Sequence, residues 1–520
     1  MKQSLYHLSM VFATVAIIVS MTSIALADSI SVSVRVEVLT RGPVHEAFAQ
    51  PVSFDEGAGF TAIRTPPEPI DEVIPYQKPE GDHILWIPGY WSWDVDRNDY
   101  IWISGCWRAV PPDTSWIPGY WVASNGGYQW IAGFWATSNT EELEYLPAPP
   151  ATLEEGPQGA GSSNSIWIPG CWVRQDGRYA WRSGFWEAAR ADWVWEPSQY
   201  IYTPNGYIYV DGYWDYPLSN RGVMFLPVYC PPTLYGHAGY QYSPDIVFNL
   251  DVLTLNLFCS PQRHHYYFGD YYGAEYAQQD YHPWYEASDH HGWYDPIFVH
   301  QQWQHNNDHQ WLAHQRQGYD QRSKDIALRP ARTYTAMTAQ VAHMPAKNRA
   351  QAQMAQPMKD VISAKTTPFK FKAVDAKTRE ASASQAKEVH AYKNKRAQWE
   401  SPAAPLNKPL MPEHATTPPE KPRIPDHATT PPEKPRIPNH ATTPPEKPLT
   451  PDHATVGKEP PASMDVSSRK VKIPRPPTAV HQPVRDKRLI PPPKPKQPQP
   501  DPKIQPRPKH DAPERAKDHE

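Results

Sequence analysis

The chain has 520 residues, a formal net charge of -4 at pH 7, and 62 prolines. A charge balance so close to neutral is untypical of nucleic-acid-binding proteins, which are usually strongly basic, so we expect no nucleic-acid partner. The prolines concentrate late in the chain. They divide it into a front part that can fold and a tail with too few apolar residues to form a core.

Residues 1–27 have the layout of a cleavable secretory signal. Lys2 precedes an apolar run from about Leu8 to Met21, and small residues follow up to Ala27. The run is shorter than the about 18 residues that a membrane-spanning helix needs, so it predicts cleavage near Asp28 rather than an uncleaved anchor. No later segment of the sequence is long and apolar enough to span a membrane. We therefore expect an exported protein of the periplasm, the cell surface or the medium.

Short aromatic units recur after a proline-rich lead at residues 28–85. In each unit a glycine stands three residues after the first aromatic residue and a second aromatic stands five residues after it, and most units start 14 residues apart. They form two blocks of four units, residues 86–137 and 166–216, separated by a polar linker at 138–165 that we expect to be flexible. One unit, "WEPSQY" from Trp195, departs from the pattern at both later positions. The repeat aromatic array comprises Trp86, Trp91, Trp102, Trp107, Trp116, Trp121, Trp130, Trp135, Trp167, Trp172, Trp181, Trp186 and Trp214. The repeat glycines are Gly89, Gly105, Gly119, Gly133, Gly170, Gly184 and Gly212.

The repeat length fits one strand plus one turn. Segments such as "DVDRND", "SNGG" and "RQDG" are rich in residues that favour tight turns. Side chains five residues apart point to opposite faces of a regular strand, so we expect a bulge at each glycine that brings Tyr128, Trp130 and Trp135 onto one face. An alternative places hairpin tips at Pro-Gly, but an L-proline turn has the wrong twist for a two-residue hairpin. The tryptophans then form either a buried core or an exposed platform for sugars or proteins.

The rest of the chain changes composition in four steps. Additional strands are expected at 217–262, a segment rich in His, Tyr and Gln at 263–320, and an Ala/Lys-rich, partly helical region at 321–400 that includes an exposed helix, "AKTREASASQAKEVHAYKNKRAQWE". Residues 401–520 form a proline-rich tail with 13-residue repeats of the type "HATTPPEKPRIPD", which we expect to be disordered. The fold class is therefore mainly β, with Trp-rich antiparallel strand repeats, a short helical region and a long tail.

The cysteines and histidines suggest two further features. Four cysteines in an exported chain permit two disulfides, and we favour Cys230 with Cys259 and, as the second pair, Cys106 with Cys171, with free buried thiols as the alternative. Four histidines spaced four or five residues apart would lie on one side of a helix, so weak binding of zinc, copper or nickel is one hypothesis and a polar, aromatic surface is the other. These are His300, His305, His309 and His314.

A family resemblance comes from the spacing Tyr100, Trp102, Gly105 and Trp107, which recurs from Tyr128 to Trp135 and from Tyr179 to Trp186. These units resemble the YXWGXW or WXXGXW repeat of exported bacterial proteins labelled BcpO-related. The lead, from "RGPVHEAFAQPVSF" to "PPEPIDEVIPYQKPEGD", is similar to that of large planctomycete proteins carrying this repeat. The resemblance covers about Val38 to Tyr216 and implies a place in the cell envelope without an established activity.

No segment of the sequence has a catalytic motif of the GxSxG, HExxH, P-loop or dinucleotide type. The acidic residues of the linker, among them Glu154 and Glu155, lie on a segment too flexible to hold paired carboxylates at a working distance. We therefore expect a non-enzymatic envelope protein, structural or interacting, without a cofactor, whose partners are envelope polysaccharide or other envelope proteins. The alternatives are glycan binding by exposed Trp and Tyr faces and metal binding by the histidine segment.

Overall fold

The computed structural model describes residues 35–54, 61–124, 126–288, 292–364, 368–401, 468–478 and 491–501. All of them belong to one unit of the chain. The secretory signal at 1–27 and the 13-residue proline-rich repeats lie outside the described residues, so these two predictions stay open. Within the described ranges, no helix combines the length and apolarity that crossing a bilayer requires.

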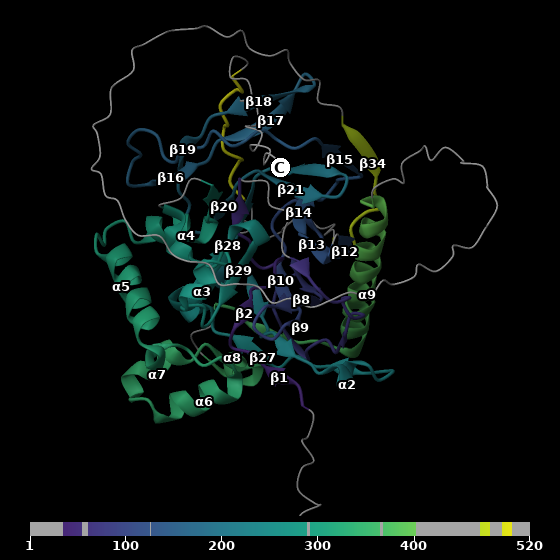
Figure 1. Cartoon of the computed structure of the whole chain (residues 1–520), viewed down its shortest axis with the longest axis vertical. Coiled ribbons are helices and arrows are strands. Elements are labelled where there is room, and N and C mark those ends of the chain that lie inside the picture. Colours follow the sequence, from purple (N-terminus) through teal and green to yellow (C-terminus); the bar gives the residue numbers. More distant parts are fainter. Residues whose placement is uncertain are drawn as a thin grey trace, which may run out of the picture. The chain divides into compact units, whose positions relative to one another are not determined.

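The repeat units fold in pairs, and each pair forms one hairpin of four antiparallel strands, which we call a module (Figure 1). In the first module the inner strands pair with each other, and the outer strands pair with each other beyond a break at the glycines. The other three modules repeat this arrangement. The strands of the first two modules are β7 (Ile84–Ile87), β8 (Tyr90–Asp94), β9 (Asp99–Ile103), β10 (Cys106–Ala109), β11 (Thr114–Ile117), β12 (Tyr120–Ser124), β13 (Gly127–Ile131) and β14 (Phe134–Thr137). Those of the third and fourth are β16 (Ser165–Ile168), β17 (Cys171–Gln175), β18 (Arg178–Arg182), β19 (Phe185–Ala188), β20 (Val194–Glu196), β21 (Gln199–Thr203), β22 (Gly206–Val210) and β23 (Tyr213–Asp215).

The reversal turns lie where the sequence predicts them. "DVDRND" joins β8 to β9 and "RQDG" joins β17 to β18, where Asp176 has φ 50° and Gly177 has φ 77°. Positive φ at both central residues is the type I′ geometry that matches the twist of the paired strands. The Pro-Gly alternative is wrong, because β7 pairs with β10 and not with β8, which follows it. The expected bulge is also wrong: the strands break at the glycines, and separate ladders continue on either side.

The strands pair within couples of units, so each predicted block of four units contains two modules. One prediction about chain organisation needs correction. The expected flexible linker at 138–165 contains β15 (Glu142–Leu146), which pairs with β22 and with β34 (Arg469–Lys472) from the tail. Hydrophobic side chains explain the order of this strand, since Leu143, Tyr145 and Leu146 are buried. Parts of the tail are therefore built into the fold.

Further short strands and helices surround the modules. The strands are β1 (Glu37–Val38), β2 (Gly42–Pro43), β3 (Val52–Ser53), β4 (Thr61–Ala62), β5 (Asp71–Glu72), β6 (Gln77–Pro79), β24 (Gly222–Met224), β25 (Val228–Tyr229), β26 (Gln241–Tyr242), β27 (Ile246–Phe248), β28 (Leu257–Ser260), β29 (His265–Phe268), β30 (His282–Pro283), β31 (Trp293–Tyr294), β32 (Ala355–Pro357) and β33 (Phe371–Ala373). The helices are α2 (Pro232–Tyr235), α3 (Ala274–Ala277), α4 (Pro296–Gln304), α5 (Trp311–Lys324), α6 (Tyr334–His343), α7 (Ala346–Ala352), α8 (Met358–Ser363) and α9 (Ala376–Trp399).

The predicted helix near residue 390 is confirmed as α9, which begins after the N-cap Asp375, whose side chain accepts from the Thr378 backbone N–H. Its expected exposure is correct for one face only, because the other face is buried. The helix contacts β7 and β12 and buries Tyr392 and Arg396. The Arg396 guanidinium donates to the carbonyls of Pro118 (3.0 Å) and Ala132 (2.8 Å), so a basic residue in a helix of low apolarity carries the docking contact.

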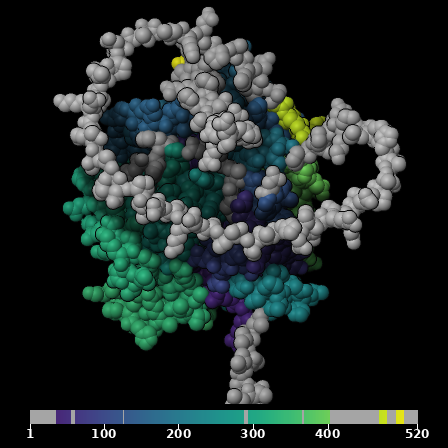
Figure 2. Space-filling model, viewed as in Figure 1, coloured from purple at the N-terminus to yellow at the C-terminus, as the bar shows by residue number. Residues whose placement is uncertain are grey.

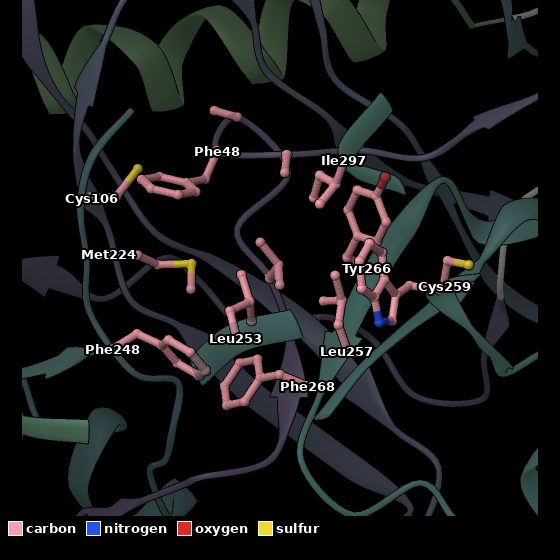
Figure 3. Packing of buried hydrophobic residues seen from close by; sticks show 14 of the residues in the cluster. Phe48, Cys106, Met224, Phe248, Leu253, Leu257, Cys259, Tyr266, Phe268 and Ile297 are labelled. Carbon is pink, nitrogen blue, oxygen red and sulfur yellow. The ribbon is translucent and has the colours of Figure 1, made fainter. Parts of the chain in front are cut away.

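The largest hydrophobic cluster draws on the turn before the modules and on the strands after them (Figure 3). Phe48, Met224, Leu253 and Phe268 lie in it together with one edge of the second module. Of the repeat aromatic array, every member is buried except Trp121 and Trp186, which are half-buried. The tryptophans therefore form core, and the exposed platform is not what the modules present.

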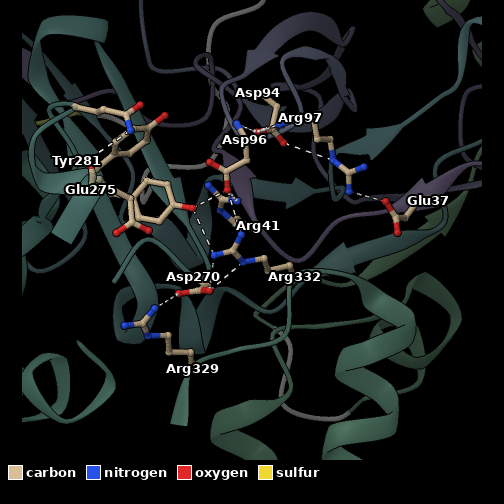
Figure 4. A network of polar contacts seen from close by, with 12 residues as sticks. Glu37, Arg41, Asp94, Asp96, Arg97, Asp270, Glu275, Tyr281, Arg329 and Arg332 are labelled. Atoms are coloured by element: carbon tan, nitrogen blue, oxygen red, sulfur yellow. Dashed lines mark hydrogen bonds and ion pairs between the residues drawn. The ribbon is translucent and has the colours of Figure 1, made fainter. Parts of the chain in front are cut away.

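A polar network ties the start of the described chain to more distant segments (Figure 4). Arg41 is paired with Asp96 in the turn between β8 and β9, and Arg332 bridges Asp96 (3.1 Å) and Asp270 (2.8 Å). Nearby, Arg97 reaches Glu37 at 2.5 Å. These pairs hold the first module against the segment that follows α5 and the loop after β29.

The preferred disulfides are absent, and all four cysteines are free thiols. Cys230 lies in a different hydrophobic cluster from Cys259. Cys106 and Cys171 occupy strands of two different modules, β10 and β17, which share no sheet. Equivalent positions in the sequence do not place these residues next to each other, because their strands belong to separate sheets.

Candidate functional site

The glycines of a module face each other at the break between its inner and outer strands, a position that we call the waist. A Cβ atom added to Gly105 would lie 2.5 Å from Cζ2 of Trp86, and one added to Gly89 would lie 2.7 Å from the Trp102 ring. The second and third modules have the same geometry. Each first tryptophan of a unit therefore lies on the glycine of the partner unit, which explains why the repeat requires glycine at this position.

The tryptophans also pair across the strands. Trp86 and Trp107 have ring centroids 5.2 Å apart at 71°, and Trp91 and Trp102 are 5.2 Å apart at 77°. Such edge-to-face pairs contribute about 0.5–1.5 kcal/mol each beyond the burial of their surface. The corresponding pairs in the other modules are Trp116 with Trp135, Trp121 with Trp130, Trp167 with Trp186, Trp172 with Trp181, Trp195 with Trp214 and Tyr200 with Tyr209.

A glutamate from outside the strands of the module fills the waist of the first module. The Glu72 carboxylate accepts hydrogen bonds from the backbone N–H of Gly89 (3.0 Å) and Gly105 (2.8 Å), and from Nε1 of Trp102 (2.8 Å). Burial raises the pKa of Glu72 to about 7, and the N–H donors act in the opposite direction. The carboxylate satisfies the backbone groups that the broken ladder leaves unpaired.

The next two modules contain equivalent glutamates. In the second, Glu46 accepts from the Gly133 N–H (2.9 Å) and from Nε1 of Trp130 (3.3 Å), and burial raises its pKa to about 7. In the third, Glu154 accepts from Nε1 of Trp167 (2.9 Å) and from the Gly170 N–H. The expectation that Glu154 lies on a flexible linker is wrong, because these bonds fix it in a buried waist.

The fourth module replaces the glutamate with a hydroxyl. Ser198, which stands where the other units have glycine, accepts from the Gly212 N–H at 3.0 Å. The acidic residues of this module are used elsewhere: Asp215 and Glu196 bind the buried Arg221 at 3.2 and 2.7 Å, and Asp215 also binds the buried Arg108. The serine that replaces glycine in "WEPSQY" therefore supplies the hydrogen-bond acceptor that a glutamate supplies in the other modules.

Proline-rich segments carry two of the waist glutamates across the modules, and we call residues 64–72 and 147–155 the straps. Indole and phenol groups donate to strap carbonyls: Nε1 of Trp91 to Glu68 (2.8 Å) and Nε1 of Trp172 to Ala151 (3.0 Å). Tyr100 and Tyr179 do the same to Arg64 and Pro147, each at 2.7 Å. The straps share a sequence signal, "TPPEPIDE" and "APPATLEE", with an acidic pair after two prolines. That signal, which the sequence reasoning missed, marks two of the three waist glutamates, Glu72 and Glu154.

A groove lies beside the third module and is the candidate binding site. Its volume is about 430 Å³, within the range of small-molecule and peptide sites, and its lining includes Trp167 and Trp186 of the module and Trp293, Phe298 and Trp303 from β31 and α4. β16 contacts α4, and Figure 2 shows the surfaces of these two regions, blue and teal, next to each other. No lysine, arginine or histidine is among the described residues that line it.

Asp295 stands in the lining at the start of α4. Its Oδ1 accepts from the Phe298 N–H (2.9 Å) and from the Tyr266 hydroxyl (2.6 Å), so it caps the helix. Burial raises the pKa of Asp295 to about 7. Its Oδ2 and the indole Nε1 of Trp303 are buried polar atoms without a hydrogen-bond partner. The wall of the groove thus combines aromatic rings with unused hydrogen-bonding capacity.

The four histidines of the metal hypothesis do not converge. His300 is buried in α4, where burial lowers its pKa to about 4, and His305 stacks on Trp311 with ring centroids 5.1 Å apart. His309 and His314 are exposed. Across the described ranges, no three His, Cys, Asp or Glu side chains come together as metal ligands would. The helix expected to align the four is interrupted between α4 and α5, so this site prediction is wrong for these residues.

The modules define a tryptophan-rich protein of antiparallel β repeats. The family described as WXXGXW repeat (2 copies) matches residues 85–108, 116–136 and 166–187. The chain therefore contains WXXGXW repeats in these three stretches, which correspond to the three modules with a waist glutamate. Neither the curated proteins nor the solved structures contain a match to this chain.

Proposed function

We propose that this chain is an exported, non-enzymatic protein of the cell envelope, in which the modules form a rigid scaffold that presents contact surfaces to other envelope components. The observation that carries the proposal is the closure of the modules. Their tryptophans are largely buried, and each waist is filled by the chain's own glutamate or serine. The repeats thus use their aromatic surface for folding, which supports a structural role.

Buried ion pairs between modules support the same role. Arg108 of the first module binds Asp215 of the fourth, and it also donates to the carbonyl of Ala47 at 2.8 Å. Arg221 donates to the neighbouring carbonyl of Phe48 at 2.9 Å. A buried charge network of this kind is costly to disrupt, since removal of one partner leaves the others uncompensated. It favours a single fixed arrangement of the first and fourth modules around the turn at 45–49.

Export is tested by expressing the full chain with a C-terminal tag in a Gram-negative host. We expect the mature chain to begin near Asp28 and to fractionate outside the cytoplasm, as mass spectrometry and cell fractionation would show. Ile17→Arg, which interrupts the apolar run, is the matched control and should remain as cytoplasmic precursor. An unprocessed parent chain in the cytoplasm would contradict the proposal.

The second candidate function is glycan binding, and one observation favours it. The faces of the modules are buried, but Trp186 is half-buried and lines the groove together with Trp303. Aromatic rings of this kind stack on the apolar faces of sugars. The glycan hypothesis is therefore restricted to this groove, where its test coincides with that of the following proposal.

A further inference from the structure

A single mode of contact recurs in several places where a proline-rich segment meets a module. An aromatic N–H or O–H donates to a carbonyl of the segment, which runs past in extended form. Both straps show it, and the tail shows it again, since Nε1 of Trp214 donates to the carbonyl of Pro493 (3.3 Å) in "PPPKPKQPQP". Nε1 of Trp186 similarly donates to Gln158 (2.9 Å) in "GPQG". Proline-rich chains suit this contact because they are already extended and leave their carbonyls unpaired.

The groove beside the third module has the parts for one more such contact. Its rings come from Trp186, Trp293 and Trp303, and Trp303 carries an indole N–H without an acceptor. The exposed Gln302 lies on the same helix at the rim. Asn306 donates to the carbonyl of Ser163 at 2.6 Å, which fixes the loop on the opposite side. Rings on both sides of a groove are what polyproline-type segments bind.

The charge of the lining narrows the choice of partner. Among the described residues of its lining, Glu154 and Asp295 are the acidic side chains, and no lysine, arginine or histidine accompanies them. An acidic peptide or an anionic polymer would therefore meet only like charge or none. A neutral or basic segment meets no such opposition, and the tail segment that packs on the fourth module, "PPPKPKQPQP", is basic.

We propose that the groove is a docking site for an extended, basic, proline-rich segment of a partner protein, read by Trp186 and Trp303. The site deepens the interaction role proposed above, but peptide binding in solution does not depend on export. A failure of peptide binding would therefore not refute export, and a failure of export would not refute peptide binding. A neutral saccharide is the competing occupant, and the experiment separates the two.

The test measures binding of a fluorescently labelled peptide, "PPPKPKQPQP", to the full chain by anisotropy. We expect saturable binding with a Kd below about 1 mM. Trp303→Ala should weaken it at least tenfold. Trp399→Ala, at the half-buried end of α9 and outside the groove, is the matched control and should change it less than twofold.

Further measurements separate loss of peptide binding from misfolding of the variant, and peptide binding from saccharide binding. Gln302→Arg changes only an exposed side chain and adds a cation, so it should weaken the peptide severalfold, and less at high salt. A peptide with every proline replaced by alanine should not bind. The proposal is overturned if the parent chain does not bind the proline peptide, if Trp303→Ala and Gln302→Arg bind it as the parent does, or if neutral hexose oligosaccharides bind the groove and displace the peptide.

Discussion

Replacement of a waist glycine by alanine is the sharpest test of how the modules are built. At Gly133 the added methyl would lie 2.5 Å from Cζ2 of Trp116, and 2.8 Å from both the Ile117 carbonyl and the Gly119 nitrogen. Two of these atoms belong to backbone, so no side-chain rotation relieves the contact. The Trp116 ring is itself buried and cannot move into solvent.

The magnitude follows from three contributions. Overpacking of a core costs about 1–3 kcal/mol. If the waist opens, the Gly133 N–H loses its bond to Glu46, and a buried donor without a partner costs about 1–3 kcal/mol more. In the opposite direction, replacing glycine by alanine reduces the conformational entropy of the unfolded chain, which stabilises the folded protein by about 0.4–1 kcal/mol. Gly133→Ala should therefore lower the free energy of unfolding by about 1–5.5 kcal/mol.

The assay is denaturant unfolding of the full chain followed by tryptophan fluorescence. Gly318→Ala, inside α5, is the control for the substitution itself and should stabilise that helix by about 0.5–1 kcal/mol. Gly177→Ala, in an open turn at φ +77°, measures backbone strain alone, about 1–2 kcal/mol. If Gly133→Ala costs no more than Gly177→Ala, the tryptophan does not require glycine beneath it.

Three other predictions follow from the buried polar groups. Burial raises the folded pKa of Glu46 from 4.5 to about 7, so the stabilising contribution of the protonated side chain is complete below pH 4.5 and is lost as the pH rises through 7. The free energy of unfolding of Glu46→Gln should therefore rise by about 2–3 kcal/mol relative to that of the parent between pH 5 and pH 8. A difference that stays constant with pH would refute this. Asp215→Ala leaves the buried Arg108 without its carboxylate partner and leaves Arg221 paired with Glu196 alone, so it should cost about 3–5 kcal/mol. Asp211→Ala breaks an exposed pair and should cost less than about 1 kcal/mol in the same denaturation assay. Iodoacetamide should label all four thiols of the denatured, unreduced chain. In the native chain it should label Cys106 and Cys259 only slowly, because burial raises the pKa of both thiols. Fewer than four labels after denaturation, counted by mass spectrometry, would indicate a disulfide.

Local patterns predicted the strands and turns well, because both depend on neighbouring residues. The tight turn at Asp176 and Gly177 needs only two residues that tolerate positive φ, and the sequence places them next to each other. The need for glycine in each unit was also visible. Its cause was not, because the Trp116 ring that lies on Gly133 belongs to the partner unit.

The waist glutamates escaped prediction because the contacts are distant in sequence. Glu46 precedes the second module, with the whole first module in between, and nothing near Gly133 reveals it. Glu154 was assigned to a flexible linker on composition alone, although its strap resembles the one that carries Glu72. Arg396 on α9 escaped prediction for the same reason. A basic residue on a polar helix predicts a solvent-exposed side chain, and its acceptors, the carbonyls of Pro118 and Ala132, lie far away in the sequence.

The reciprocal cover of tryptophan on glycine has a consequence for how such proteins grow. A single unit added by duplication would bring a ring with no glycine beneath it and a glycine with no ring above it. Gene duplication is therefore expected to preserve even numbers of units, with the pair as the smallest heritable step. Each added pair also needs an acceptor for its waist, either by copying a strap with its glutamate or, as at Ser198, by changing one unit to supply its own. Comparison of repeat numbers among proteins with this motif would show whether odd counts are rare.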